Sequence, residues 1–397
     1  MPGERLRLTP LELASGLVFG VVPDAPSLPE SPPTLTPLAA LEQAVLPALA
    51  RPPCLVSFSG GFDSSAVLAV ATGVARREGL APPVPITQRY PGRPATEETS
   101  WQELVIAHLR LANWQRLEVE DELDFVGPVA QDVLRRHGVL YPPNAYVHAP
   151  LLEAASRGSL LTGIGGDDLL GGWPFARWRG LLERQARPEP RDLLRALHAL
   201  APRPAREAVA RRRLTQRLPW LRQPAEEAVL HASARESCQE PRSWRRRVLR
   251  QTRRRYLLLG LQSIGLLAKD AGVLAVHPLA DRRFAATLAD AGGRLGLGDR
   301  TALMWRLFGN LLPPRLLARR DKARFHEAFW SGPSRRFAQG WNGEGVDRQL
   351  VDASRLRETW LDPGGIVLPA MLLQSAWLAS GGGQLEQAVA RAVERGP

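Results

Sequence analysis

The stretch Cys54-Leu55-Val56-Ser57-Phe58-Ser59-Gly60-Gly61-Phe62-Asp63-Ser64-Ser65 decides the fold of this chain. Its apolar beginning, residues 54–58, predicts a short strand, and the apolar pattern of residues 64–77 predicts a helix. Two adjacent glycines between them let the backbone approach an anion and adopt dihedral angles that a side chain forbids. The N–H groups of such a turn and of the following helix N-terminus converge on negative charge. The stretch therefore predicts a nucleotide-binding loop, although it matches neither G-x-x-x-x-G-K-S/T nor G-x-G-x-x-G.

The polar side chains of this loop suit a phosphate ligand. Ser59, Ser64 and Ser65 offer hydroxyl donors, and Asp63 can hold Mg²⁺ against phosphate oxygens. The pattern resembles the pyrophosphate loop S-G-G-x-D-S-S/T of ATP pyrophosphatases, which release pyrophosphate from ATP and keep AMP on an activated substrate. With a second loop included, the predicted contacts to ATP and pyrophosphate are Ser57, Ser59, Gly60, Gly61, Asp63, Ser64, Ser65, Thr162 and Gly163.

The second loop follows another apolar run, residues 159–164, and reads Gly165-Gly166-Asp167-Asp168-Leu169-Leu170-Gly171-Gly172-Trp173. In a parallel sheet, ligands lie beyond the carboxyl ends of the strands at the switch point, so both loops can meet over one nucleotide. Asp63 and Asp167 would then share one Mg²⁺, which bridges the phosphates and stabilises charge on the leaving pyrophosphate. We therefore predict that both aspartates are metal ligands and that Asp167 is catalytic.

These two loops resemble the synthetase domain of the asparagine synthetase family, whose second motif usually reads S-G-E-G-x-D-E-x-x-G-G. Further stretches resemble the family in the same order, so that the similarity covers about residues 35–330. They are His277-Pro278-Leu279-Ala280-Asp281 for V-P-F-L-D, Trp305-Arg306-Leu307-Phe308 to Leu312-Pro313 for L-R-x-x-F…L-P, and Arg320-Asp321-Lys322-Ala323-Arg324-Phe325 for R-x-K-x-x-F. The resemblance implies an ATP-dependent, AMP-forming amide ligase with ATP and Mg²⁺ as cofactors. It also implies that Lys322 is catalytic and contacts the phosphates of the adenylate and of pyrophosphate.

The chain departs from the family pattern on the side of the amide acceptor. Ile164 stands where the family has the glutamate of S-G-E-G, and isoleucine can neither accept a proton nor bind a metal. A general base must therefore come from elsewhere, and Asp168 is the nearest candidate in sequence. The family usually carries D-R-x-S-M-A-x-x-x-E-x-R before V-P-F-L-D, whereas residues 265–276 read GLLAKDAGVLAV without those charges in register. A pocket for free aspartate is therefore not expected.

The N-terminal sequence predicts no glutaminase activity. Family members that use glutamine begin with a glutaminase domain whose nucleophile is the cysteine exposed after Met1, but position 2 is Pro2 and only residues 1–53 precede the first predicted strand. The two cysteines are Cys54, expected to be a small buried hydrophobe, and Cys238. We therefore expect the amine to come from a substrate side chain, from free ammonia, or from a separate amine-supplying or peptide-delivering protein.

The order of patterns predicts an α/β fold with a doubly wound parallel sheet, followed by a mainly helical C-terminal region. We divide the chain into a Pro-rich N-terminal segment (1–50), a nucleotide-binding α/β core (51–180) and a helical region (181–397). Predicted strands are residues 54–58, 85–89, 114–119 and 159–164; predicted helices are residues 37–49, 64–77, 100–109, 128–137 and 149–157. Beyond Trp173, Trp244 and Tyr256 belong to an apolar helical face, with arginines on the opposite face. His108 and His148 lack metal-ligand spacing and are expected to be structural.

Composition is typical of a cytoplasmic enzyme. A chain of 397 residues with 44% hydrophobic content can bury a large core. Two cysteines, no leader pattern and no apolar run of about 18 residues argue against secretion and membrane insertion. The net charge of +12 comes from arginine, and the main arginine clusters lie at residues 211–213, 245–247 and 253–255. Such clusters could bind RNA, bind an acidic protein or cover a solvated helix face, and we favour the solvated face.

Three functions remain open from the sequence. The first is an amide ligase that adenylates a carboxylate, which is either an asparagine synthetase or a tailoring ligase similar to the cyclase that closes the macrolactam of lasso peptides. The second is a tRNA-modifying ATP pyrophosphatase, which shares the first loop but not the later motifs. The third is a non-catalytic relative that binds nucleotide, a reading kept open by Ile164. We rank the ligase first, because Asp63, Asp167 and Lys322 together have little use in a scaffold.

Overall fold

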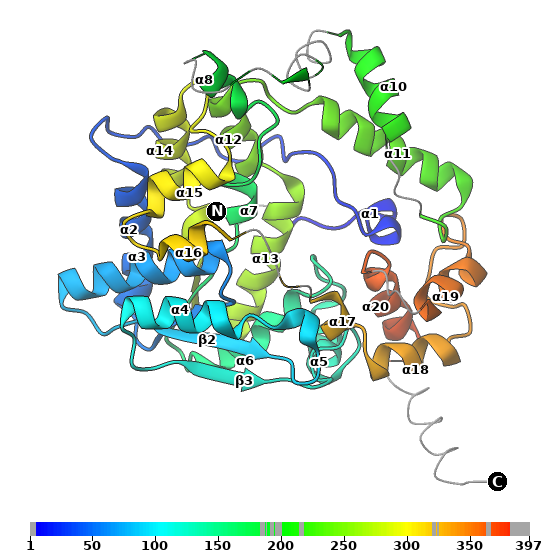
Figure 1. The fold of residues 1–397 in the computed structure, drawn as a ribbon. Helices are drawn as coiled ribbons and strands as arrows, with labels where there is room; N and C mark the ends of the chain where they lie inside the picture. The colour runs from blue at the N-terminus through cyan, green and yellow to red at the C-terminus, as the bar shows by residue number, and fades with distance from the viewer. Residues whose placement is uncertain are drawn as a thin grey trace.

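The fold was analysed in a computed structural model of the chain. It describes residues 5–182, 187, 189, 190, 194, 201–213, 218–319, 323, 325–362 and 367–381. Within them lie one five-stranded sheet and many helices, which confirms the predicted α/β class with a helical region after the sheet (Figure 1).

The sheet is entirely parallel, with the strand order β3-β2-β1-β4-β5. Its strands are β1 (Cys54–Ser57), β2 (Val84–Arg89), β3 (Gln115–Glu118), β4 (Ser159–Leu161) and β5 (Leu274–Val276). In the centre, Leu55 pairs with Leu160 of β4 and with Val84 of β2. Strand order reverses between β1 and β4, so the loops after these two strands border the crevice where doubly wound sheets bind ligands.

Successive residues of the central strands point to opposite faces of the sheet, as strand geometry requires. Val56 and Leu161 belong to the hydrophobic core on one face, whereas Leu55 and Leu160 belong to the core on the other. All four side chains are almost fully buried. Because both faces are covered, the strands read as continuous apolar runs, which is why they could be predicted from the sequence.

Helices cover both faces. On one face α2, α3 and α14 pack together, and on the other α5, α6 and α13 do. The helices of the first two thirds of the chain are α1 (Pro10–Ser15), α2 (Pro37–Leu49), α3 (Phe62–Glu78), α4 (Thr99–Leu109), α5 (Pro128–His137), α6 (Ala149–Ala154), α7 (Gly166–Leu169), α8 (Arg177–Leu182), α10 (Arg203–Arg213), α11 (Gln223–Cys238), α12 (Trp244–Thr252) and α13 (Arg255–Asp270). Those that follow are α14 (Arg282–Gly292), α15 (Arg300–Phe308), α16 (Pro314–Leu317), α17 (His326–Phe329), α18 (Gly332–Gly340), α19 (Ala353–Leu361) and α20 (Ala370–Ala379). Three short 3₁₀ helices are η1 (Pro94–Thr96), η2 (Ala145–His148) and η3 (Pro278–Ala280).

Most predicted elements occur with small shifts in their ends. The helices predicted at residues 37–49 and 128–137 have the predicted bounds, as α2 and α5. The strand predicted at residues 159–164 ends at Leu161, because the glycine-rich loop begins earlier than its apolar composition suggests. Strand β5 was not predicted and lies in the range assigned to the helical region, so the sheet takes a strand from that range. The three domain boundaries stay predictions. In the described part of the chain, no helix has the length and apolar character of a membrane span.

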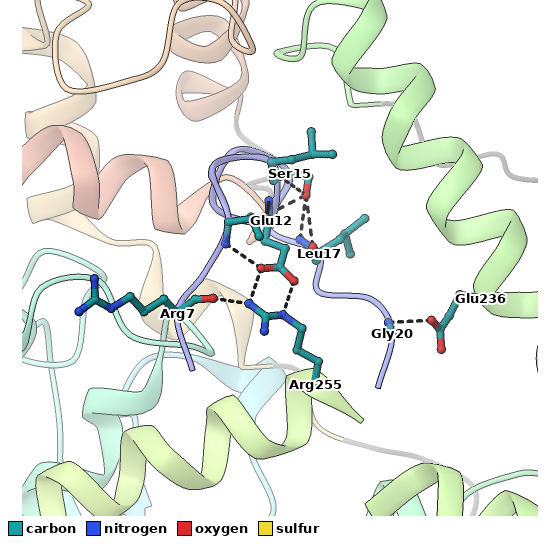
Figure 2. Close-up of polar contacts among 9 residues, drawn as sticks. Arg7, Glu12, Ser15, Leu17, Gly20, Glu236 and Arg255 are labelled. Carbon is teal, nitrogen blue, oxygen red and sulfur yellow. Dashed lines mark hydrogen bonds and ion pairs between the residues drawn. The ribbon is translucent and has the colours of Figure 1, made fainter. Parts of the chain in front are cut away.

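Residues 5–25, which we call the N-terminal strap, are tied to the start of α13 and to α11 (Figure 2). The Arg255 guanidinium donates to both carboxylate oxygens of Glu12, at 2.7 and 3.0 Å, and also to the carbonyl oxygen of Arg7. The Gly20 N–H donates to Glu236 Oε2 at 2.8 Å. Glu236 also pairs with Arg250 and Arg254, so the strap is anchored on a charge network at the beginning of α13.

A buried carboxylate joins the loop after β3 to the start of α18. Asp124 is fully buried, and its oxygens accept hydrogen bonds from the Ser331 N–H (2.6 Å), the Ser331 hydroxyl (2.8 Å), the Ser334 hydroxyl (2.6 Å) and the Val126 N–H (2.9 Å). Four donors satisfy both oxygens, which is the condition under which a charge can be buried. This link fixes the chain that follows residues 320–325 against the loop after β3.

We predict that Asp124→Ala lowers the free energy of unfolding by about 3 kcal/mol or more, because hydrogen bonds to a charged group contribute about 1.5–3 kcal/mol each and the donors would stay buried without a partner. Urea unfolding followed by tryptophan fluorescence measures this change. The matched control is Asp132→Ala, whose side chain is 64% exposed and forms a surface ion pair with Arg136. That variant should differ by about 0.5 kcal/mol or less. Equal losses in the two variants would contradict the role of Asp124.

Candidate active site

The loop after β1 forms the predicted anion-binding turn. Gly60 has φ +82°, and a Cβ atom placed on it would lie 2.8 Å from the Gln102 side chain, so only glycine fits the turn. The hydroxyls of Ser59 and Ser64 lie 3.1 Å apart, and the Gly61 N–H donates to Ser59 Oγ at 3.3 Å. Gly61 is the N-cap of α3, and no side chain of the described residues caps that helix. The first N–H groups of α3 are therefore available to an anion.

The loop after β4 lies directly against the first turn of α3. A Cβ atom on Gly163 would lie 2.9 Å from the Ser64 nitrogen, and one on Gly166 would lie 2.6 Å from Oδ1 of Asp63. Gly165 has φ +92° and is the N-cap of α7. The glycines of the second motif therefore permit the backbone contact that brings the two loops together.

A cavity of about 590 Å³ opens where the two loops meet. Of the predicted residues, Ser57, Ser59, Gly61, Asp63, Ser64, Thr162, Gly163 and Asp167 line it. Gly60 instead shapes the turn, and Ser65 is fully buried with no hydrogen-bond partner for its hydroxyl among the described residues. The prediction for Lys322 lies outside the described residues, but its neighbour Ala323 lines the cavity.

One guanidinium bridges the two predicted metal ligands. Arg300, the first residue of α15, donates to both oxygens of Asp63 at 2.9 and 3.0 Å and to Oδ1 of Asp167 at 2.5 Å. The Asp63 side chain is 17% exposed and that of Asp167 is 65% exposed. The structure thus brings both carboxylates to a single cation at the edge of the cavity. Their role as metal ligands stays a prediction.

The chemistry of these donors fits Mg²⁺ bound together with a nucleotide. Mg²⁺ usually takes one or two protein carboxylates and completes its shell with water and phosphate oxygens. In the part of the chain that the structure describes, no group of three or more His, Cys, Asp or Glu side chains is arranged to hold a metal without such a ligand. Asp63 and Asp167 supply the two carboxylates, and the free N–H groups of α3 lie beside them for the phosphates.

A buried ion pair that was not predicted closes the other wall of the cavity. Both oxygens of Glu98 accept from the Arg319 guanidinium, and Oε1 also accepts from the Ala323 N–H at 2.8 Å. Both side chains are about 95% buried, and Arg319 lies 4.8 Å from the centre of the Trp101 ring. Glu98 therefore holds the Ala323 backbone at the cavity. The sequence could not predict Arg319 as the partner of Glu98, because nothing distinguishes this residue from the many other arginines of the chain.

Arg247 supports the second loop from behind. Its guanidinium donates to the backbone carbonyls of Asp168 (3.2 Å), Leu169 (3.2 Å) and Gly171 (3.1 Å). The side chain is 2% exposed, so the expectation that the arginines of residues 245–247 lie on a solvated face is wrong for this residue. The carbonyl oxygens at the end of short α7 need donors, and Arg247 supplies them.

Asp168, the candidate general base, belongs to a separate polar group. It accepts a hydrogen bond from the Tyr256 hydroxyl on α13. Burial raises the pKa of Asp168, and the hydrogen bond from Tyr256 opposes this shift. Burial and the nearby Asp168 charge raise the pKa of Tyr256, so its hydroxyl stays a donor. Asp168 lines the cavity, as expected of a base, but one of its oxygens is already engaged.

A histidine also lines the cavity. His148 is the last residue of η2, and its Nδ1 lies 3.2 Å from the Ala145 carbonyl oxygen. Nearby, His277 bonds through Nδ1 to Thr162 Oγ1 at 2.7 Å. Burial lowers the pKa of both rings, that of His277 to about 4, with His148 as the second cause for His277. Both imidazoles are therefore neutral near pH 7.

We predict that Gly166→Ala weakens binding of Mg-ATP about tenfold or more, because the added methyl group overlaps the Asp63 carboxylate and overpacking costs about 1–3 kcal/mol. Isothermal titration calorimetry measures the affinity. Gly172→Ala is the matched control, since nothing lies within 4 Å of a Cβ atom at that position of the same motif. Equal affinity in both variants would show that the contact with Asp63 is not required.

The comparisons with known proteins agree with this geometry. The model of the asparagine synthase family matches residues 38–377, a range that includes both loops, Arg300 and Arg319. No curated protein sequence matches the chain. Because the match covers most of the chain, the protein belongs to the asparagine synthase family of ATP-dependent ligases.

Proposed function

We propose that this protein activates a carboxylate by adenylation and transfers the acyl group to an amine, without hydrolysing glutamine. The observation that carries the proposal is the meeting of two phosphate-site loops at one cavity, with Asp63 and Asp167 on a common cation. In a member of the asparagine synthase family, this arrangement supports cleavage of ATP between its α- and β-phosphates. The reaction would yield an acyl-adenylate and pyrophosphate, followed by an amide and AMP.

The residues of the phosphate loops have defined tasks in the first step. The N–H groups at the start of α3 and the hydroxyls of Ser59 and Ser64 would bind the β- and γ-phosphates. Asp63 and Asp167 would hold Mg²⁺, which neutralises charge on the leaving pyrophosphate. Lys322 would add a positive charge on the same phosphates. No proton has to be removed in this step, because the attacking carboxylate is already ionised.

The acceptor side favours a tailoring ligase over an asparagine synthetase. Residues 265–276 form the end of α13 and strand β5, and their only charged residues are Lys269 and Asp270. Asp270 is paired with Arg136 at 2.7 Å and with His137 at 2.6 Å. Neither Lys269 nor Asp270 lines the cavity. This segment therefore offers no charge for the α-amino and α-carboxyl groups of free aspartate.

A macrolactam cyclase similar to those of lasso peptides is one such tailoring ligase. Its carboxylate and amine belong to a peptide, so the amine needs no glutaminase and a separate protein can deliver the substrate. A cytoplasmic location and the absence of a nucleic-acid partner complete this proposal.

The main rival is a nucleotide-binding relative without catalysis. The cation site between Asp63 and Asp167 speaks against it, because a scaffold does not need paired carboxylates beside a phosphate loop.

We predict that the protein exchanges labelled pyrophosphate into ATP when its own carboxylate is present, because adenylation is reversible. A panel of free aspartate, free glutamate and carboxylate-bearing peptides tests this, and free aspartate should be a poor substrate even with high ammonia. Glutamine should support no reaction. Tight aspartate-dependent exchange would instead identify an ammonia-dependent asparagine synthetase. Failure to exchange with every carboxylate tested, combined with absent Mg-ATP binding, would instead favour a non-catalytic scaffold.

We predict that Lys322→Ala lowers the exchange rate by about 10²-fold or more, the usual loss when a group that stabilises transition-state charge is removed. The chain offers a matched control, since its other lysine, Lys269, is exposed on α13. Lys269→Ala should keep the wild-type rate. A wild-type rate in Lys322→Ala would mean that this lysine does not act on the phosphates.

A further inference from the structure

Amide formation needs a proton acceptor that the residue at position 164 cannot provide. An amine that attacks an acyl-adenylate loses a proton as the new C–N bond forms. Ile164 lines the cavity but has no basic atom. Asp168 has one oxygen engaged by Tyr256. Amide formation therefore requires another group on the cavity wall that has a free lone pair.

His148 lies on that wall, in the region that Ile164 occupies. The Ile164 N–H donates to Thr162 Oγ1 at 3.3 Å, and Thr162 Oγ1 bonds to His277 Nδ1 at 2.7 Å. His277 in turn is close enough to His148 for the two rings to interact electrostatically. His148 and the loop that follows β4, including Ile164, therefore line the same cavity. Of these two histidines, His148 is the one that lines the cavity.

The hydrogen bond to Ala145 determines which nitrogen of His148 can act as a base. A carbonyl oxygen only accepts hydrogen bonds, so Nδ1 of His148 carries the proton and donates it to the Ala145 oxygen at 3.2 Å. In the neutral ring, Nε2 then holds the lone pair. Among the residues that the structure describes, we find no hydrogen-bond partner for Nε2. The fold thus holds His148 in the tautomer that a general base requires.

We propose that Nε2 of His148 is the general base of amide formation, a role that rests on the proposed ligase function. The neutral amine attacks the carbonyl carbon of the acyl-adenylate, and a C–N bond forms. The nitrogen gives one proton to Nε2, and the C–O bond to the phosphate breaks with its electron pair leaving on AMP. The products are the amide, AMP and an imidazolium, which returns its proton to water.

The surroundings of His148 keep it ready to accept a proton. Burial lowers its pKa, and the hydrogen bond with Ala145 opposes that shift. The charged groups that share its cavity are Asp63, Glu98, Asp167, Asp168, Arg300 and Arg319, and His277 follows β5. The elements packed against η2 also carry titratable groups: Tyr256, Lys269 and Asp270 on α13, Glu153 on α6, and Asp132, Arg135, Arg136 and His137 on α5. Because its folded pKa is below 6.5, the ring stays neutral through pH 7. It is protonated, and amide formation stops, only as the pH falls below that value.

The decisive variant is His148→Asn. The asparagine amide nitrogen can still donate to the Ala145 oxygen, but no atom can accept a proton at the Nε2 position. Amide formation should fall by about 10²–10⁴-fold, the usual contribution of a general base. Pyrophosphate exchange should stay within about threefold of wild type, because adenylation needs no base. The acid limb of the wild-type pH profile for amide formation should disappear in the variant.

Two controls separate this role from the alternatives. His108→Asn changes an exposed histidine on α4 and should leave both rates unchanged. Asp168→Asn tests the carboxylate candidate, which should lower amide formation less than His148→Asn does. Equal losses of exchange and amide formation in His148→Asn would show a structural role and overturn the proposal, as would unchanged amide formation. If the wild-type protein shows no pyrophosphate exchange with any carboxylate tested, the ligase function itself fails and the proposal fails with it.

A measurement without any substrate tests the geometry directly. In ¹⁵N spectra of histidine-labelled protein, the resonances missing from His148→Asn identify His148. They should show the Nδ1–H tautomer, which stays neutral to below pH 6.5. An Nε2–H tautomer, or titration at or above the ordinary histidine pKa, would overturn the proposal even if the ligase activity is confirmed.

Discussion

Because Gly163 and Gly166 carry no side chains, the loop after β4 reaches the first turn of α3, and the rest of the site depends on that contact. It places Asp167 on the same side of the cavity as Asp63, and it leaves the start of α3 open to an anion. Parallel pairing of β1 with β4 supplies the coarse geometry, since both strands end at one edge of the sheet. The absence of side chains at these glycines then lets the two loops come into direct contact. Neither feature alone would bring two carboxylates to one cation.

The charges around the cavity are balanced by fixed partners. Asp63 and Asp167 face Arg300, while Glu98 faces Arg319 on the opposite wall. Asp167 is largely exposed, so it can take a further cation without giving up its contact with Arg300. The fixed contacts of Arg300 with Asp63 and Asp167 reduce the cost of holding these two carboxylates close together.

The sequence could predict the parts of the site that depend on local patterns. A strand, a glycine turn and a helix follow one another at residues 54–78, so this loop could be assigned, and five of its assigned residues line the cavity together with three from the second loop. Arg300, Arg319 and Arg247 could not be assigned, because each acts on a partner far away in sequence and looks the same as the many other arginines. Strand β5 was missed because three partly buried residues give no periodic signal. Long-range pairing, rather than local propensity, places these elements.

Because Ile164 cannot accept a proton, a neighbouring side chain has to do so, and Asp168 and His148 differ in how well they suit that role. Asp168 accepts from Tyr256, whose raised pKa keeps it a donor, and Arg247 and Arg254 act electrostatically on the same carboxylate. Burial raises the pKa of Asp168, but one of its oxygens is already occupied by the Tyr256 hydroxyl, and protonation of that oxygen would break this contact. His148 has the opposite properties. One nitrogen is fixed by a carbonyl, and the other has no hydrogen-bond partner among the described residues. Position 164 holds isoleucine, which cannot accept a proton. The neutral imidazole of His148 on the same cavity wall can accept one at Nε2 while Nδ1 keeps its hydrogen bond to Ala145.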